Sequence, residues 1–178
     1  MRNIVLIGMP GSGKTTIGAT LAQNLGYRLI DTDWLVMDTY GKSLQAVIAE
    51  AGVDGFLRYE GLVGEGIACE HCVIATGGSM VFSNGAMQNL RRLGTVVWLD
   101  APLDVLKRRI TAGSDRGIAA EAGVTVEQLD DVRRPLYERY ADICVQSVGT
   151  KRDIAAQVER LVRAQGATAR DERADQSE

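Results

Sequence analysis

Residues 8–15 have the sequence GMPGSGKT, and this stretch constrains the fold more than any other part of the chain. It matches the pattern G-x-x-x-x-G-K-[ST] in full, and it lies between an apolar run at residues 3–7 and a helical apolar pattern at residues 14–25. A strand, a glycine-rich turn and a helix in that order point backbone N–H groups and a helix N-terminus at one anion. The stretch therefore predicts a loop that binds the phosphates of a nucleoside triphosphate.

The residue types of this loop predict its individual contacts. Lys14 can reach the outer phosphates, and the hydroxyl of Thr15 can hold Mg²⁺. The expected nucleotide-binding residues are Gly11, Ser12, Gly13, Lys14, Thr15 and Thr16.

Strand-like and helix-like segments alternate along the rest of the chain. Short apolar runs predict strands at residues 3–7, 28–30, 72–76, 95–99 and 142–146. Apolar spacing and helix-start signals predict helices at residues 14–25, 34–40, 44–51, 56–70, 84–92, 102–110, 126–140 and 153–164. This alternation is typical of an α/β fold with a parallel sheet, in which ligands bind beyond the carboxyl ends of the strands. The helix at 56–70 is unusual because it contains Gly61, Gly64 and Gly66, for which close packing is the only explanation that the sequence offers.

Length and composition narrow the class of protein. A chain of 178 residues predicts one domain, which we expect over residues 1–165, and the polar segment 166–178 predicts disorder. The net charge of −3 and the aromatic content of 5% argue against a nucleic-acid partner. No apolar run approaches the roughly 20 residues that span a bilayer, and the N-terminus does not resemble a signal peptide. We expect a cytoplasmic monomer with no membrane partner.

The three cysteines predict no disulfide framework. Cys69 and Cys72 form a C-x-x-C motif around His71, and Cys144 lies far away in the sequence. A structural zinc site needs four ligands in a favourable arrangement, so metal or redox use is the minor interpretation. The simpler interpretation is that the pair are small side chains at a helix–strand junction.

Polar and glycine residues follow several of the predicted strands. Asp31 and Asp33 follow the second strand, where two carboxylates suit a metal-linked water and the activation of a hydroxyl, although Asp33 could simply cap a helix. Gly77 and Gly78 follow the third strand and would allow close approach of the backbone to a ligand. The arginines near these strand ends are Arg109, Arg116, Arg133 and Arg134, of which Arg116 lies in a Gly- and Ala-rich loop over residues 111–125. Such a loop could act as a lid that brings positive charge onto phosphates, whereas each arginine alone is a common surface residue.

In combination, these motifs resemble the shikimate kinase family, a branch of the nucleoside-monophosphate-kinase-like fold. The resemblance covers about residues 3–161 and rests on GMPGSGKTT, LIDTD, GKSLQAVI, Phe56 with Glu60, TGG, the lid and RRPLYERYAD. It implies a five-stranded parallel sheet in the order 2-3-1-4-5 and transfer of the ATP γ-phosphate to a ring hydroxyl of a small acid. On the acceptor side, the resemblance implies that Asp33 binds and activates the hydroxyl, that Gly77 and Gly78 line the site, and that Arg133 binds the carboxylate. On the nucleotide side, it implies that Asp31 supports Mg²⁺ through water, that Arg116 acts on ATP from the lid, and that Arg109 lies near adenine.

The chain departs from the family pattern at two positions. Leu57 stands where the motif F-R-x-x-E has an arginine that grips the carboxylate, and Ser79 stands where the family has a third glycine. Arg58 is roughly 100° further around a helix and should face elsewhere. The loss of one charge-assisted contact costs ~1.5–3 kcal/mol, so a second acceptor hypothesis is a smaller hydroxy acid or amino acid such as homoserine.

A GTP-binding regulatory protein is the alternative from another class. The sequence TKRD at residues 150–153 resembles a guanine-reading tetrad after the last strand. No D-x-x-G switch follows a strand, and the same loop, with Arg152, can border adenine and cap the final helix instead. Another small-molecule kinase, such as a gluconate kinase, stays possible on the fold alone.

Overall fold

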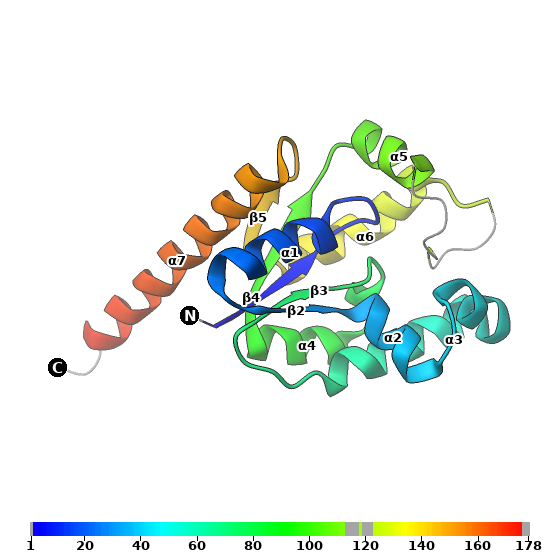
Figure 1. Ribbon diagram of the computed structural model, residues 1–178, viewed down its shortest axis with the longest axis horizontal. Coiled ribbons are helices and arrows are strands. Elements are labelled where there is room, and N and C mark those ends of the chain that lie inside the picture. The colour runs from blue at the N-terminus through cyan, green and yellow to red at the C-terminus, as the bar shows by residue number, and fades with distance from the viewer. Residues whose placement is uncertain (1, 113–117, 119–122, 176–178) are drawn as a thin grey trace.

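The computed structural model describes residues 2–112, 118 and 123–175, and it is an α/β structure with helices on both sides of one sheet (Figure 1). Its elements in chain order are β1 (Asn3–Ile7), α1 (Lys14–Leu25), β2 (Arg28–Asp31), α2 (Thr32–Tyr40), α3 (Leu44–Gly66), β3 (Cys72–Ala75), a short 3₁₀ turn η1 (Met80–Phe82), α4 (Asn84–Leu93), β4 (Gly94–Asp100), α5 (Leu103–Ala112), α6 (Val126–Tyr140), β5 (Ile143–Gln146) and α7 (Lys151–Asp175).

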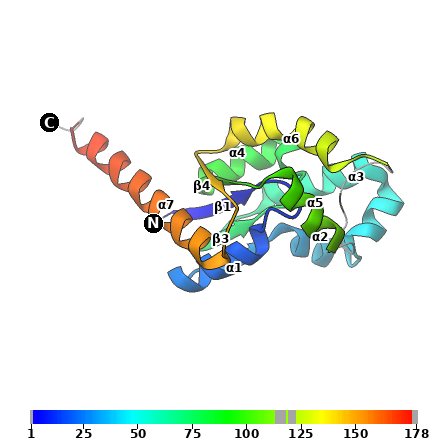
Figure 2. The same cartoon turned by 90° about the horizontal axis from the view of Figure 1, so that it is seen from above.

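The five strands are parallel and lie in the order β2-β3-β1-β4-β5, which confirms the predicted sheet. Val5 of β1 is paired with Ile74 of β3 on one side and with Val96 of β4 on the other. All five residues of β1 are buried, as expected for a central strand that is covered on both faces. Because the strands are parallel, their carboxyl ends meet at one edge of the sheet, toward α2, α3 and α5 in Figure 2.

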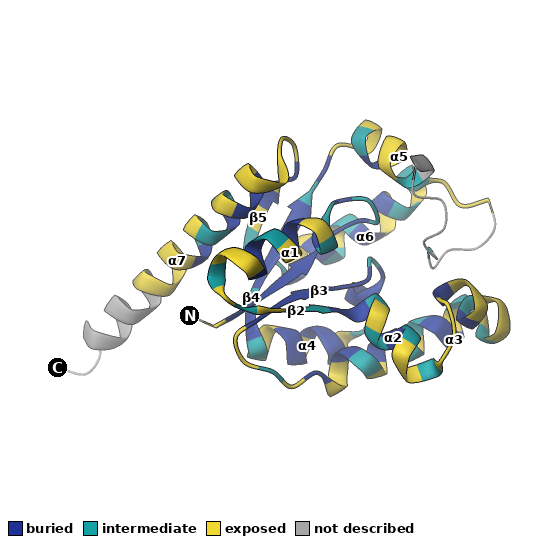
Figure 3. Cartoon of the chain, viewed as in Figure 1, coloured by how far each residue is buried: buried dark blue, intermediate teal, exposed yellow. Residues whose placement is uncertain are grey.

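Two apolar clusters fill the two faces of the sheet. Val5 and Ile7 pack with residues of α4 and α6, including Leu90 and Tyr137. Their neighbours in the strand, Ile4 and Leu6 among them, pack with α1 and α7 on the opposite face. Figure 3 shows the result, with buried strands between helices that are exposed only on their outer sides.

Helix α3 differs from the sequence prediction in its bounds. The element Leu44–Gly66 consists of two helical segments that meet at Gly52, where the backbone is not helical (φ 71°, ψ 175°), so the predicted break between helices at 44–51 and 56–70 is confirmed, but the second segment ends at Gly66 and not at residue 70. A third apolar cluster, which contains Val36, Val47 and Phe56, joins α3 to α2. At the C-terminal end of α3, Asn89 of α4 donates hydrogen bonds to the carbonyl oxygens of Gly64 and of the C-cap residue Ile67, groups that have no partner within the helix.

The glycines of α3 are explained by close contact with the segment that follows β3. A Cβ atom on Gly61 would lie 2.9 Å from Ser83 Oγ, and one on Gly64 would lie 2.6 Å from Met80 Sδ. Gly66 has no heavy atom within 4 Å of the same position, so packing does not explain this glycine. Residues 61 and 64 therefore let α3 approach η1 and α4 closely.

The last helix is longer than predicted. The apolar pattern predicts an end at Ala164, but α7 continues to Asp175. Residues 166–175 lack an apolar face yet contain several good helix formers, which are compatible with this continuation. Among the described residues, we find no helix that is long and apolar enough to cross a membrane.

Candidate active site

The phosphate-binding loop connects β1 to α1 at the carboxyl edge of the sheet. Gly8 has φ +141° and Gly13 has φ +96°, both in a region that side chains disfavour. A Cβ on Gly8 would also lie 2.6 Å from the carbonyl oxygen of Leu99 in β4. The loop therefore needs glycine at these positions for its backbone shape, which is the shape that the sequence pattern predicts.

Lys14 lies inside the loop rather than in solvent. Its side chain is 8% exposed, and Nζ donates hydrogen bonds to the carbonyl oxygens of Gly8 (2.8 Å) and Met9 (2.9 Å). Burial lowers the pKa of the Lys14 ammonium to about 8, and the carboxylates of Asp33 and Asp31 oppose this effect. A phosphate bound in the loop would add negative charge beside Nζ and favour the protonated form.

Two segments from other parts of the fold hold the loop. Ser147, which follows β5, is fully buried and donates a hydrogen bond from Oγ to the carbonyl oxygen of Ser12 (2.6 Å). Arg109 of α5 donates from Nη1 to the carbonyl oxygen of Gly11 (3.1 Å), which places this predicted site residue against the loop. Sequence reasoning missed Ser147, although its position directly after a strand at the carboxyl edge was a usable signal.

Thr15 and Asp31 are in direct contact. Thr15 Oγ1 donates a hydrogen bond to Asp31 Oδ2 (2.7 Å), and the other oxygen, Oδ1, accepts from the backbone N–H of Asp33 (3.0 Å). Asp31 is thus the N-cap of α2, a role for which the sequence offered Asp33 as a candidate. A hydroxyl and a carboxylate held together are oxygen ligands of the kind that Mg²⁺ prefers, so the residues fit the predicted metal.

The glycines after β3 bring the acceptor-side residues together. A Cβ on Gly77 would lie 2.8 Å from Asp33 Oδ1 and would clash with Glu60 Oε1. A Cβ on Gly78 would lie 3.0 Å from Arg133 Nη1. The structure therefore places Asp33 and Arg133, which are far apart in the sequence, beside consecutive glycines at one edge of the sheet.

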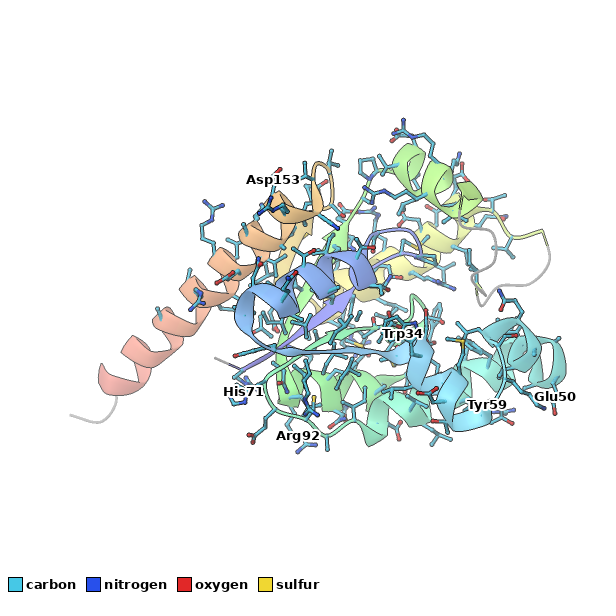
Figure 4. The ribbon with its side chains drawn as sticks, in the orientation of Figure 1. Trp34, Glu50, Tyr59, His71, Arg92 and Asp153 are labelled. Carbon is cyan, nitrogen blue, oxygen red and sulfur yellow. The ribbon has the colours of Figure 1, made fainter. Side chains whose placement is uncertain are left out.

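Helix α6 positions Arg133 in the interior. Arg133 is 1% exposed, and its guanidinium carbon lies 5.7 Å from the ring centroid of Phe82. One turn later, the hydroxyl of Tyr137 donates to the carbonyl oxygen of Gly78 (2.6 Å). This bond fixes α6 against the glycine turn, and Tyr137 is a further residue that the sequence did not indicate. Trp34, at the start of α2, is 51% exposed (Figure 4).

Glu60 is a second carboxyl group on the acceptor side. It is 1% exposed, and its Oε2 accepts a hydrogen bond from Ser79 Oγ (2.5 Å). Burial raises the pKa of Glu60 to about 7, and the charge of Asp33 acts in the same direction. In the sequence, Glu60 stands out only as part of a family motif, and the spacing of that motif is the available signal for a site role.

The two departures from the family pattern have different surroundings. Leu57 is half-buried and packs against the apolar cluster between α2 and α3, whereas Arg58 is exposed, as expected for a residue that faces elsewhere. Ser79 is buried, and its hydroxyl donates a hydrogen bond to Glu60.

Arg116 and Arg152 are the two remaining predicted nucleotide contacts. Arg116, with most of the predicted lid, lies outside the described residues. Arg152 is exposed in the first turn of α7. Thr150 Oγ1 donates to Asp153 Oδ2 (2.6 Å) and accepts from the Asp153 backbone N–H, so the TKRD tetrad caps α7 (Figure 4). In the structure, this loop therefore caps the final helix, which is the alternative to guanine recognition.

The C-x-x-C segment lies at the other end of the strands. Cys72 begins β3 and is buried, while the carbonyl oxygen of Cys69 accepts from Asn3 Nδ2 (2.7 Å). The ring of His71 meets Tyr27 edge-on at 5.4 Å, and Figure 4 shows His71 at the periphery. These contacts support the interpretation of the pair as side chains at a helix–strand junction.

The fold and the site define the class of protein as a phosphotransferase. A phosphate-binding loop follows the first strand, and the acidic Asp33 and the basic Arg133 lie on the acceptor side at the same edge of the parallel sheet. The family model for shikimate kinase matches residues 10–163 of the chain. The chain belongs to the shikimate kinase family.

Individual relatives agree with this assignment. The shikimate kinase of Trichormus variabilis is 35% identical over 165 residues, which cover 90% of each chain. The shikimate kinase of Rippkaea orientalis is 39% identical over 146 residues, covering 80% of this chain and 77% of the relative. The structure of shikimate kinase from Acinetobacter baumannii in complex with shikimate superposes with a TM-score of 0.85 at 27% identity, over 93% of this chain and 94% of that one. The comparisons do not favour the GTP-binding or homoserine alternatives.

Proposed function

We propose that this protein transfers the γ-phosphate of ATP to a ring hydroxyl group of shikimate. The observation that carries the proposal is the meeting of Asp33 and Arg133 at Gly77 and Gly78, at the same edge of the sheet as the Lys14 loop. Shikimate is a hydroxylated ring acid, and the relative from Acinetobacter baumannii was solved with shikimate bound. The carboxylate of Asp33 can accept hydrogen bonds from the hydroxyl groups of such a molecule, and the guanidinium of Arg133 can pair with its acid group.

The loop residues bind ATP in this proposal. The backbone N–H groups of residues 11–16 surround the phosphates, with Gly11, Ser12, Gly13 and Thr16 contributing, and Lys14 supplies positive charge inside the loop. Arg109 and Arg152 border the adenine side, and Arg116 acts on the phosphates from the segment 111–125.

Thr15 and Asp31 would hold Mg²⁺ in this proposal, Asp31 through a water molecule. The metal ion supplies charge neutralisation on the phosphate oxygens when it is bound. Asp31 also keeps the N-terminus of α2 in place, so the same carboxylate that supports the metal fixes the backbone of Asp33.

Asp33 and Arg133 act on the acceptor. Arg133 binds the carboxylate of shikimate, and Gly77 and Gly78 leave room for the ring. Asp33 accepts the proton of the attacking hydroxyl as its oxygen forms a bond to the γ-phosphorus, and the bond from that phosphorus to the β–γ bridging oxygen breaks to release ADP. Rate acceleration then comes mostly from positioning and charge neutralisation.

The first experiment measures kcat/KM with Mg-ATP for shikimate and for homoserine, and compares ATP with GTP. The proposal predicts robust turnover of shikimate with ATP. An Asp33→Asn variant should lose about a hundredfold or more in kcat, because proton acceptance is removed while the shape is kept. Turnover of homoserine alone, or a preference for GTP, would contradict the proposal.

The proposal also includes the organisation of the protein. We propose one catalytic domain over residues 1–165 that acts as a monomer in the cytoplasm. Light scattering after size exclusion tests the monomer, and a mass of twice 19.2 kDa would contradict it.

A further inference from the structure

Arg134 of α6 has no task in the proposed reaction, although it directly follows the acceptor arginine Arg133 in the chain. Successive residues of a helix point about 100° apart, so the two guanidinium groups face different parts of the fold. Arg133 lies against Gly78 and the ring of Phe82, on the acceptor side. The guanidinium carbon of Arg134 lies 5.1 Å from the ring centroid of Trp98 in β4. Helix α6 therefore presents one arginine to the acceptor side and the next to the sheet.

Two aspartates bind Arg134 at the same time. Its Nε donates to Asp130 Oδ2 (2.9 Å), one turn earlier on α6, and its Nη2 donates to Asp100 Oδ1 (3.0 Å), at the end of β4. The side chain of Asp130 is 7% exposed and that of Asp100 is 17% exposed, so these ion pairs are screened only in part. Gln146 of β5 donates to the other oxygen of Asp100 (2.9 Å). Arg134 thus ties α6 to the last two strands of the sheet.

The turn of α6 that carries these arginines lacks part of its own backbone bonding. Pro135 lies inside the helix and has no N–H, so the carbonyl oxygen four residues earlier loses its helical donor. The proline ring also crowds that carbonyl group, which bends or loosens a helix. The contact from Arg134 to Asp130 spans the same turn, and the contact to Asp100 fixes the turn to the sheet. Side chains therefore supply rigidity that the backbone of this turn lacks.

Tyr137 anchors α6 at a second point. Its hydroxyl donates to the carbonyl oxygen of Gly78 (2.6 Å), and its ring stacks on Trp98 with the centroids 6.0 Å apart. Trp98 is therefore in contact with both Tyr137 and Arg134, which lie three residues apart on α6. A helix that is held at one point can still turn about its axis, and the ion pairs of Arg134 remove that freedom.

Building on the proposed function, we propose that Arg134 is a positioning residue for Arg133. By fixing the rotation of α6 against β4, Arg134 holds the Arg133 guanidinium in an orientation in which two parallel N–H groups can bind one carboxylate. Such a forked contact depends on geometry, and a small rotation of the guanidinium weakens it. Arg134 thereby sets the preference for acceptors that carry a carboxylate, without contacting the acceptor itself.

The test compares shikimate with its methyl ester, which has the same ring hydroxyl groups and no negative charge. The acid preference is the ratio of kcat/KM for shikimate to kcat/KM for the ester at saturating Mg-ATP. We expect Arg134→Met, which keeps an unbranched side chain beside Trp98, to lower this ratio about tenfold by raising KM for shikimate. KM for ATP should change by less than about twofold. A loss of stability alone would affect both acceptors equally and leave the ratio unchanged.

Arg139→Met is the matched control. Arg139 is exposed near the end of α6, and its guanidinium carbon lies 5.5 Å from the ring centroid of Tyr140. The variant therefore removes the same charge and a similar ring contact from the same helix, and the acid preference should stay at its wild-type value. Arg134→Lys keeps the positive charge, but one ammonium group does not reproduce the forked contact with both aspartates. We expect a fall of about two- to fivefold in this variant.

A double variant tests whether Arg134 acts through Arg133. Arg133→Met alone should lower the acid preference about tenfold or more, because the group that binds the carboxylate is gone. Addition of Arg134→Met should then lower the ratio no further, since nothing remains to be positioned. A further fall in the double variant would contradict the proposal, because Arg134 would then act on the acceptor by another route.

The possible outcomes distinguish this proposal from the proposed function. No turnover of shikimate by the wild type would overturn the proposed function, and a wild-type ratio of about one would overturn the role of Arg133. A clear acid preference that stays unchanged in Arg134→Met would overturn only the role of Arg134. If Arg134→Met fails to fold, Asp100→Asn decides, because it weakens the contact with β4 and leaves the contact within α6. An unchanged acid preference in that variant contradicts the proposal.

Discussion

Thr15 Oγ1 donates a 2.7 Å hydrogen bond to Asp31 Oδ2, so the last residue of the phosphate-binding motif contacts the last residue of β2. Thr15 lies in the first turn of α1 and Asp31 ends β2, and both lie at the carboxyl edge of the sheet although β3 separates β2 from β1. This contact by itself holds the two proposed metal-binding side chains together, and it links the loop to the residue that caps α2.

Replacing Asp31 with asparagine tests the metal assignment. Asparagine is as good an N-cap as aspartate, so α2 should keep its start and the melting temperature should change little. The lost charge should raise the Mg²⁺ concentration for half-maximal activity by about tenfold or more, which corresponds to ~1.4 kcal/mol. Titration of activity with Mg²⁺ at saturating ATP measures the effect. An unchanged Mg²⁺ dependence would remove Asp31 from the metal site.

Replacing Leu57 with arginine tests the acceptor-side geometry. The change restores the family residue one turn before Glu60, and we expect KM for shikimate to fall about tenfold through a new charge-assisted contact. Leu57 packs against the cluster of α2 and α3, so we also expect a loss of about 1–2 kcal/mol in stability. Steady-state kinetics and denaturant unfolding measure the two effects separately. Arg58→Ala, at an exposed neighbour, is the control and should leave KM as it is; no gain in Leu57→Arg would argue against the proposed site.

The buried carboxyl group of Glu60 makes stability depend on pH. Burial raises its pKa in the folded state from the ordinary 4.5 to about 7, so the folded state binds the proton more tightly than the unfolded chain. The resulting stabilisation is fully present below pH 4.5 and is lost as the pH rises through 7. Its size is about 3 kcal/mol for a shift of this magnitude. Urea unfolding at pH 5 and at pH 8 should show this loss in the wild type and a smaller loss in Glu60→Gln; equal losses would contradict the assignment.

Two glycines of α3 offer a matched test of helix packing. Gly64→Ala gains helix propensity, but the new methyl group would lie 2.6 Å from Met80 Sδ and 2.7 Å from Ala86 Cβ, so we expect a net loss of about 1–3 kcal/mol. A Cβ atom at position 66 would have no heavy atom within 4 Å, so Gly66→Ala should raise the free energy of unfolding by about 0.5–1 kcal/mol. The free energies of unfolding of the two variants measure the difference. Destabilisation of both to the same extent would show that the contact with η1 and α4 is not the cause.

The sequence alone determined the features that depend on local pattern. The loop at residues 8–15, the short buried strands and the parallel α/β class followed from residue spacing, because glycine geometry and apolar periodicity act over a few residues. The arrangement of Asp31, Asp33, Gly77 and Gly78 at one edge also followed, because parallel strands end together. The order of the strands came from the family resemblance, since apolar runs do not specify their neighbours.

Tertiary structure decided what depends on contacts between distant segments. Ser147, which follows the last strand, holds the loop; Asn89 binds the C-terminal end of α3; and Met80 with Ala86 leaves no room for a side chain at position 64. The pairing of Glu60 with Ser79 joins residues 19 positions apart, and only the packing of α3 against the turn after β3 brings them together. The family motif marked both positions, but burial of the carboxyl group, which sets its proton affinity, is a property of the assembled fold.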